Sequence, residues 1–251
     1  MKRYFLHLSY KGTNFFGWQI QPEHRSIQEV LEEALSKLHS NKEVGVTGCG
    51  RTDTGVHASN YYAHFDSELE WNVDDLKHKL NGMVGPDIAI LSVIPVQLEA
   101  HARFDAESRT YHYFIHREKD PFLQEISWFH KPDLDITKMN EACLILQDYE
   151  DFECFSKVQT EVNHFLCDIQ NALWVESDRG YIFSITANRF LRNMVRAIVG
   201  TMVEIGLGKL EPEDMKRIIE SKNRSEAGQS APAQGLFLAD IVYPYITQSK
   251  G

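Results

Sequence analysis

Residues 48–58 read GCGRTDTGVHA, a segment in which three glycines within eight residues bracket a cation and an anion two positions apart. Glycine permits backbone turns that other residues resist, so this segment is predicted to form a tight loop. Arg51 and Asp53 can pair on such a loop, and an arginine beside an aspartate favours its charged form. Two interpretations follow from the loop alone. The pair only stabilises the turn, or it presents an ionised carboxylate for chemistry.

The bulk composition is that of an ordinary globular protein, with 251 residues, 43% of them hydrophobic and 25% charged. This length fits one large domain or two modest ones. Four cysteines without Cys-x-x-Cys spacing indicate reduced thiols in a cytosolic protein. No apolar run approaches the ~20 residues of a membrane span, so no membrane association is expected. The net charge of −10 means that any nucleic-acid binding requires a local basic surface.

Helix and strand patterns alternate around the loop. Ser26 and Glu29 form a capping box before one apolar stripe, which predicts a helix over 27–39. Further helices are predicted from a cap at Asp74 or Asp75 to Gly82, from a cap at Asp135 or Thr137 to Leu146, over 190–205, and from Pro212. Strands are predicted at 4–10, 61–66, 88–93, 108–116, 165–175, 181–187 and before Tyr243. The order fits two α+β halves, residues 1–105 and 106–251.

Two features outside the loop favour nucleic-acid chemistry. Arg189, Arg192 and Arg196 are spaced as one stripe at the start of the predicted helix over 190–205. Such a stripe is most often solvated, but on an acidic protein it favours anion recognition by a local patch. Tyr111 begins an aromatic strand face of the kind that usually packs in a core. Near a loop, its ring can instead stack on a base.

Seven motifs occur in a fixed order along nearly the whole chain and together resemble the TruA family of tRNA pseudouridine synthases. They are the signature at 50–58, the loop 12–22, His101-Ala102-Arg103-Phe104, Arg109-Thr110-Tyr111-His112-Tyr113, Asp151-Phe152, Phe190-Leu191 with Met194-Val195-Arg196 and Val199-Gly200, and Ala231-Pro232 with Gly235-Leu236-Phe237-Leu238.

The resemblance implies a fold and a reaction. The fold is the α+β pseudouridine synthase fold, in which two halves share a mixed, mostly antiparallel sheet flanked by helices. The family forms a homodimer whose basic cleft holds tRNA. Its enzymes isomerise uridines 38, 39 and 40 of the anticodon stem-loop, which implies a cytoplasmic protein. No cofactor is implied, and the sequence lacks a P-loop and a Rossmann fingerprint. Asp53 and His57 are four residues apart but have no third ligand, so no metal site is expected.

The resemblance also assigns roles to individual residues. By motif, Asp53 is the catalytic aspartate, Arg51 the arginine two residues before it, Tyr111 the ring that stacks on the uracil, Arg196 the arginine that pairs with the aspartate, and Leu236 the apolar residue lining the pocket. Arg189 and Arg192 are expected to contact phosphates of the substrate. Three positions depart from the family pattern, namely Lys11, Tyr61 and Ala100. None of the three is the catalytic aspartate or one of its partners, so activity is still expected. The departures leave open whether individual RNA contacts of the family are kept.

The expected chemistry breaks the bond between N1 and C1′ of uridine and joins C5 to C1′. Asp53 could attack the sugar carbon, as carboxylates do in glycosidases, or act as a base at C2′ so that a glycal forms, or attack C6 of the uracil. These alternatives remain open. Two rival functions also remain: a synthase that modifies another RNA or another tRNA position, and an RNA-binding module whose loop no longer catalyses.

Overall fold

The computed structural model describes residues 1–157 and 163–246, and their contacts divide the chain into two compact units. The first unit contains Met1–Glu107 together with the chain from Leu238 onward, and the second contains Ser108–Phe237. The halves predicted from the sequence, 1–105 and 106–251, stay a prediction.

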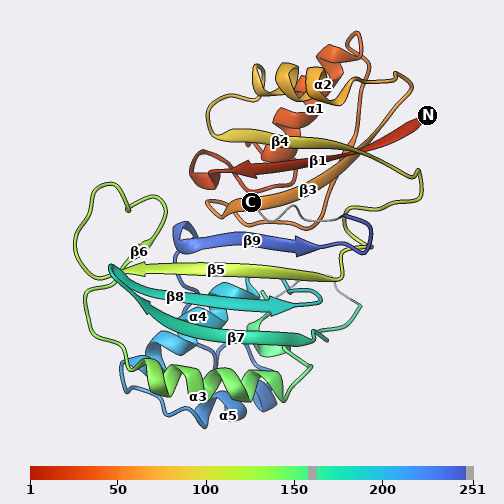
Figure 1. The fold of residues 1–251 in the computed structure, drawn as a ribbon. Coiled ribbons are helices and arrows are strands. Elements are labelled where there is room, and N and C mark those ends of the chain that lie inside the picture. The colour runs from red at the N-terminus through yellow and green to blue at the C-terminus, as the bar shows by residue number, and fades with distance from the viewer. Residues whose placement is uncertain (158–162, 247–251) are drawn as a thin grey trace. The chain divides into compact units, whose positions relative to one another are not determined.

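Long antiparallel strands form the centre of the first unit. They are β1 (Lys2–Tyr10), β3 (His57–Ser67) and β4 (Ile88–Val96), with β9 (Leu236–Val242) on the other side of β3, in the order β4-β1-β3-β9. The short strand β2 (Val46–Gly48) also pairs with β3. Figure 1 shows β4, β1 and β3 side by side. The loop that follows β2 leads into β3, the longest strand of the unit.

Two helices complete the first unit. Helix α1 (Ile27–Leu38) begins with the predicted capping box of Ser26 and Glu29, and its apolar stripe is buried. Helix α2 (Val73–Asn81) begins one residue before the predicted caps. Asn72 is its N-cap and accepts hydrogen bonds from the amides of Asp74 and Asp75, so the prediction that an aspartate caps α2 is wrong. The asparagine prevails because a cap must precede the first helical residue.

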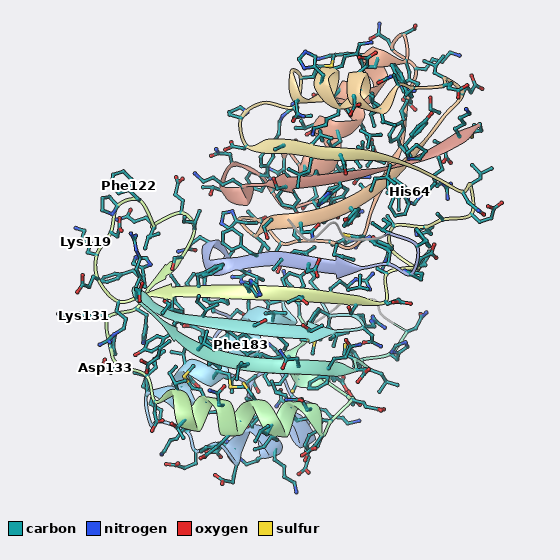
Figure 2. The ribbon with its side chains drawn as sticks, in the orientation of Figure 1. His64, Lys119, Phe122, Lys131, Asp133 and Phe183 are labelled. Carbon is teal, nitrogen blue, oxygen red and sulfur yellow. The ribbon has the colours of Figure 1, made fainter. Side chains whose placement is uncertain are left out.

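The second unit contains β5 (Ser108–His116), β8 (Gly180–Ala187) and β7 (Ile169–Ser177), paired antiparallel in that order. The two-residue strand β6 (Trp128–Phe129) pairs parallel with β5. Helices α3 (Ile136–Gln147), α4 (Met194–Gly206) and α5 (Asp214–Ser221) pack together, and α3 lies beside β7 (Figure 1). Trp174 and Phe183 are both buried and stacked with ring centroids 4.8 Å apart, and they anchor this core. Figure 2 labels Phe183.

The predicted fold class is confirmed: the chain is an α+β protein with a mixed, mostly antiparallel arrangement of strands flanked by helices. Some boundaries differ from the predicted ones. Helix α4 begins at Met194, four residues later than predicted, because Asn193 adopts a left-handed conformation with φ of 67°. Strand β7 lies four residues later than predicted at its start, and α5 begins two residues after Pro212. In the described residues, no helix is both long and apolar enough to cross a membrane.

Candidate active site

The Gly-rich segment forms the predicted loop, which lies between β2 and β3. The amide of Cys49 donates to the carbonyl of Tyr62, 2.9 Å away, and so ties the start of the loop to β3. The loop turns at Gly55, whose φ is 78°, and the amide of Val56 donates to the carbonyl of Asp53 at 3.1 Å. Asp53 is half-buried in this turn. The loop therefore holds the backbone of Asp53 while leaving part of its side chain accessible.

The N-terminal loop supports this turn from the side. The amide of Trp18 donates to the carbonyl of Thr52 at 3.2 Å, and the amide of Gly55 donates to Phe15 at 3.4 Å. The amide of Gly12 donates to Nδ1 of His57 at 3.0 Å. His57 is buried at the start of β3, so its contact is structural. Nowhere in the described residues do three His, Cys, Asp or Glu side chains gather as a metal ion would require.

Aromatic side chains support the loop from below. The hydroxyls of Tyr10 and Thr52 are hydrogen-bonded at 2.9 Å in a buried contact. Tyr61 stacks on Trp18 with centroids 4.3 Å apart, and its hydroxyl donates to the carbonyl of Gly50. Tyr61 is one of the departures from the family pattern. In this structure Tyr61 supports the loop.

The predicted pairing of Arg51 with Asp53 is not found. Arg51 is exposed, and across the described part of the chain no carboxylate lies within ion-pair distance of it. The loop owes its shape to backbone hydrogen bonds and to Trp18 and Tyr61. Arg51 presents its charge to solvent two residues before Asp53.

In the second unit, Tyr111 lies on β5 opposite Ile185 and is half-buried. Its ring meets Phe190 edge-on, with centroids 5.2 Å apart and planes at 90°. Tyr113, two residues further on the same strand face, is buried and donates its hydroxyl proton to the carbonyl of Pro232 at 2.7 Å. Burial raises the pKa of Tyr113 well above its ordinary value, so this hydroxyl stays a donor. The Pro232 segment is thereby fixed to β5.

The same segment holds Arg196 and Leu236. The Arg196 side chain donates from Nε to the carbonyl of Ala231 at 2.7 Å, and the amide of Ala231 donates back to the carbonyl of Arg196 at 2.9 Å. Leu236 is 5% exposed and begins β9 directly after the short 3-10 helix η3 (Ala233–Gly235). The short segment 231–236 therefore contacts Arg196 of α4 at one end and contains Leu236 at the other.

The three arginines do not form one helical stripe, which corrects the sequence prediction. Arg196 is on α4, whereas Arg189 and Arg192 precede the helix in irregular backbone. Nη1 of Arg189 lies 3.2–3.3 Å from the ring nitrogens of His164. Arg192 is exposed and its carbonyl accepts from the amide of Lys157 at 3.1 Å. The contact with His164 was not foreseen, because no pattern links two residues 25 positions apart.

The predicted site residues are distributed over both units. Arg51 and Asp53 belong to the first unit, whereas the second contains Tyr111, Arg189, Arg192, Arg196 and Leu236.

Known proteins resemble this chain over nearly its whole length. A family model described as tRNA pseudouridine synthase matches residues 8–105 and 148–244, which include Asp53 and Arg196 but not Tyr111. A protein of Bacteroides fragilis named tRNA pseudouridine synthase A is 50% identical over 247 residues, covering 97% of both chains. A protein of Parabacteroides distasonis with the same name is 49% identical over 245 residues, again covering 97% of both chains. A third, from Francisella tularensis subsp. novicida, is 38% identical over 246 residues, with 97% of this chain and 95% of the relative covered.

Proposed function

The chain belongs to the tRNA pseudouridine synthase family of isomerases, and from this premise we propose that it converts uridines 38, 39 and 40 of the tRNA anticodon stem-loop into pseudouridine. Asp53 is the catalytic carboxylate in this proposal. It lies within the signature that the family model covers, on a loop between two strands.

The observation that carries the assignment of Asp53 is the way its loop is held. Its neighbour Thr52 is fixed twice, through its carbonyl to Trp18 and through its hydroxyl to Tyr10, and the carbonyl of Asp53 itself closes the turn to Val56. A carboxylate that must meet one carbon of a flipped nucleotide needs such preorganisation, because small misplacements of a reacting group reduce rates strongly. The half-buried side chain fits that demand.

The reaction needs no external group. The N1–C1′ bond breaks, the uracil turns, C5 bonds to C1′, the proton on C5 is released and N1 gains a proton. Asp53 can serve as a nucleophile at C1′, as a base at C2′ or as a nucleophile at C6. In each route the carboxylate must be ionised, because it acts either as a nucleophile or as a base. Arg51 and Arg196 supply positive charge for Asp53 and the RNA backbone, Tyr111 a ring face for the uracil and Leu236 an apolar wall.

A uridine inside a stem must leave its stack before it can react, which costs a few kcal/mol. Arg189 and Arg192 contact phosphates in this proposal, and such contacts offset that cost. Their accessible positions before α4 suit contacts with an extended backbone better than a helical stripe would.

The proposal extends to assembly and location, with a homodimer that acts on tRNA in the cytoplasm. All four cysteines are free and buried, which agrees with a reducing compartment. Light scattering on the purified chain tests the dimer, and a mass of one chain across micromolar concentrations would refute it.

The deciding assay is tritium release from tRNA that carries 5-tritiated uridine, run with wild-type protein and Asp53→Asn. Wild type is expected to release one tritium for each modified uridine, and Asp53→Asn to release none. Absence of release by wild type would exclude the isomerase and favour an RNA-binding module. Release that persists in Asp53→Asn would exclude Asp53 as the catalytic group. Mapping pseudouridine in the product then separates positions 38–40 from other sites.

A further inference from the structure

Basic side chains gather at one end of the strands of the second unit, around the turn that follows β8. They come from three separate stretches of sequence and are Arg109, Lys157, His164, Arg189 and Arg192. On a chain with a net charge of −10, such a gathering is a local departure from the overall charge. The contacts at its centre, between His164 and Arg189, define what it can bind.

The backbone that carries Arg189 is fixed on three sides through Asn188. The guanidinium of Arg109 donates to the carbonyl of Asn188 at 2.7 Å. The amide of Asn188 donates to the carbonyl of Asp168 at 3.1 Å, and the amide of Asp168 donates to Oδ1 of Asn188 at 2.9 Å. Arg189 therefore leaves β8 in a defined direction.

The ring of His164 is fixed as well. The amide of Leu166 donates to Nδ1 of His164 at 3.2 Å, so Nδ1 is the acceptor of this ring and Nε2 carries the ring proton. Nη1 of Arg189 therefore donates to Nδ1 of the same ring at 3.3 Å, which places the guanidinium beside the ring. This one bond uses neither the proton on Nε2 nor the other guanidinium protons of Arg189. Donors held side by side in this way have hydrogen-bonding capacity for an incoming anion.

We propose that His164 and Arg189 together bind one phosphate of the tRNA backbone. This rests on the proposed function and deepens it, because it assigns to Arg189 a defined partner and adds His164 to the RNA-binding residues. A phosphate oxygen accepts from Nε2 of His164 while another accepts from the Arg189 guanidinium, which satisfies both donors. The backbones of Lys157 and Arg192 are hydrogen-bonded to each other. In this proposal their two positive charges extend the phosphate-binding surface beyond His164 and Arg189.

The proposal predicts a specific change in the salt dependence of tRNA binding. His164→Gln, Arg189→Gln and the double variant are compared with wild type by measuring Kd for an unmodified tRNA at four or more salt concentrations. Arg189→Gln is expected to weaken binding roughly tenfold at low salt and to reduce the slope of log Kd against log salt by about one ion, whereas His164→Gln, which removes a donor but no charge, is expected to weaken binding roughly tenfold and to keep the wild-type slope. Because both residues hold one phosphate, the double variant is expected to lose no more slope than Arg189→Gln does.

Lys131→Gln is the matched control. Lys131 is exposed in the same unit but follows His130, which is bonded to His116 at the opposite end of β5 from Arg109 (Figure 2). It should leave the slope unchanged. Equal slopes in wild type and Arg189→Gln, or wild-type tRNA affinity in His164→Gln, would overturn the proposal. Loss of inorganic phosphate binding in these variants, with wild-type affinity for tRNA, would overturn the assignment to RNA. Tritium release by wild type is measured separately, so failure of the proposed isomerase activity is distinguishable from failure of this site.

Discussion

Gly17 lies directly against the backbone carbonyl of Thr52, so closely that a Cβ on residue 17 would overlap the carbonyl oxygen and stand 3.1 Å from the carbonyl carbon of Asp53. The backbone of Gly17 also has a φ of 83°, which side-chain-bearing residues rarely adopt. The loop that carries the candidate catalytic aspartate is therefore shaped by a residue 36 positions earlier in the chain.

Gly17→Ala is expected to displace the Asp53 loop. The added methyl group must push the Thr52 carbonyl away from the amide of Trp18, and the left-handed backbone adds strain of roughly 1 kcal/mol. We expect tritium release from tRNA to fall by at least tenfold, with a loss in kcat larger than any change in tRNA affinity, because Asp53 is misplaced while phosphate contacts remain. Single-turnover kinetics and a tRNA binding curve measure both quantities.

Gly45→Ala provides the control for this substitution. Gly45 precedes β2 in the same unit, has no positive φ and has nothing within 4 Å of an added Cβ. Its variant should keep wild-type kcat and stability. Equal kcat values for Gly17→Ala and wild type would contradict the importance of this contact for Asp53.

Arg196→Lys should test whether Arg196 acts through the directed hydrogen bonds of its planar guanidinium or only through its positive charge. Its Nε is committed to the carbonyl of Ala231, which directs the remaining nitrogens. A lysine keeps the charge but loses this orientation, so we expect kcat to fall by about 10²-fold with little change in tRNA affinity. Arg217→Lys, at an exposed arginine paired with Asp214 and Glu226, should leave kcat unchanged. Full activity of Arg196→Lys would refute the role.

Local patterns in the sequence predicted most of the elements. The strand over 108–116 was predicted to the residue, and the helix over 27–39 is one residue shorter in the structure. Both carry an uninterrupted periodicity, and α1 has a complete capping box. The start of α4 was misplaced because Phe190 and Leu191 continue the apolar spacing of the helix although their backbone is irregular.

Contacts between distant residues could not be predicted in the same way. The signature around Asp53 identified the loop, but its support by Trp18 and Tyr61 depends on where the first 20 residues return in space. The expected ion pair between Arg51 and Asp53 is not found in the described residues. Backbone hydrogen bonds from distant parts of the chain already shape the loop, and Arg51 is exposed. Short-range charge spacing alone does not determine pairing.

The buried His64 is expected to make the folded state sensitive to acid. It is 6% exposed and accepts from the amide of Ala102 through Nδ1 at 3.1 Å. Burial, with Arg3 and His101 nearby, lowers the pKa of His64 to about 4, although Asp66 and Asp105 oppose the shift. Unfolding returns the pKa to about 6.5. The neutral ring therefore contributes stability that is fully present above pH 6.5 and is lost as the pH falls towards 4, in total about 3 kcal/mol.

Denaturant unfolding of wild type and His64→Gln between pH 7.5 and 4 measures this contribution. Glutamine can still accept from Ala102 but does not titrate, so the stability of the variant should fall less steeply, by about one proton, than that of wild type. His116, which is in the other unit, titrates in both proteins, so its contribution cancels in the difference. Parallel stability curves for the two proteins would show that His64 does not carry this dependence.

Gly200→Ala is expected to reverse the usual effect of such a change within a helix. Alanine normally stabilises a helix interior by up to ~1 kcal/mol relative to glycine. Gly200 lies in α4, however, where a Cβ would overlap the carbonyl oxygen of Gln229 and stand 2.8 Å from its carbonyl carbon. The segment that ends in Ala231 must then move off the helix, so we expect a net loss of roughly 1–3 kcal/mol in unfolding free energy. The same shift disturbs the paired hydrogen bonds between Ala231 and Arg196, so kcat should fall as well.

Gly82→Ala, at the end of α2 with right-handed backbone and no contact closer than 3.4 Å, should be neutral or stabilising in the same denaturant titration. Stabilisation by Gly200→Ala would mean that α4 and the Gln229 segment are not packed this closely in solution.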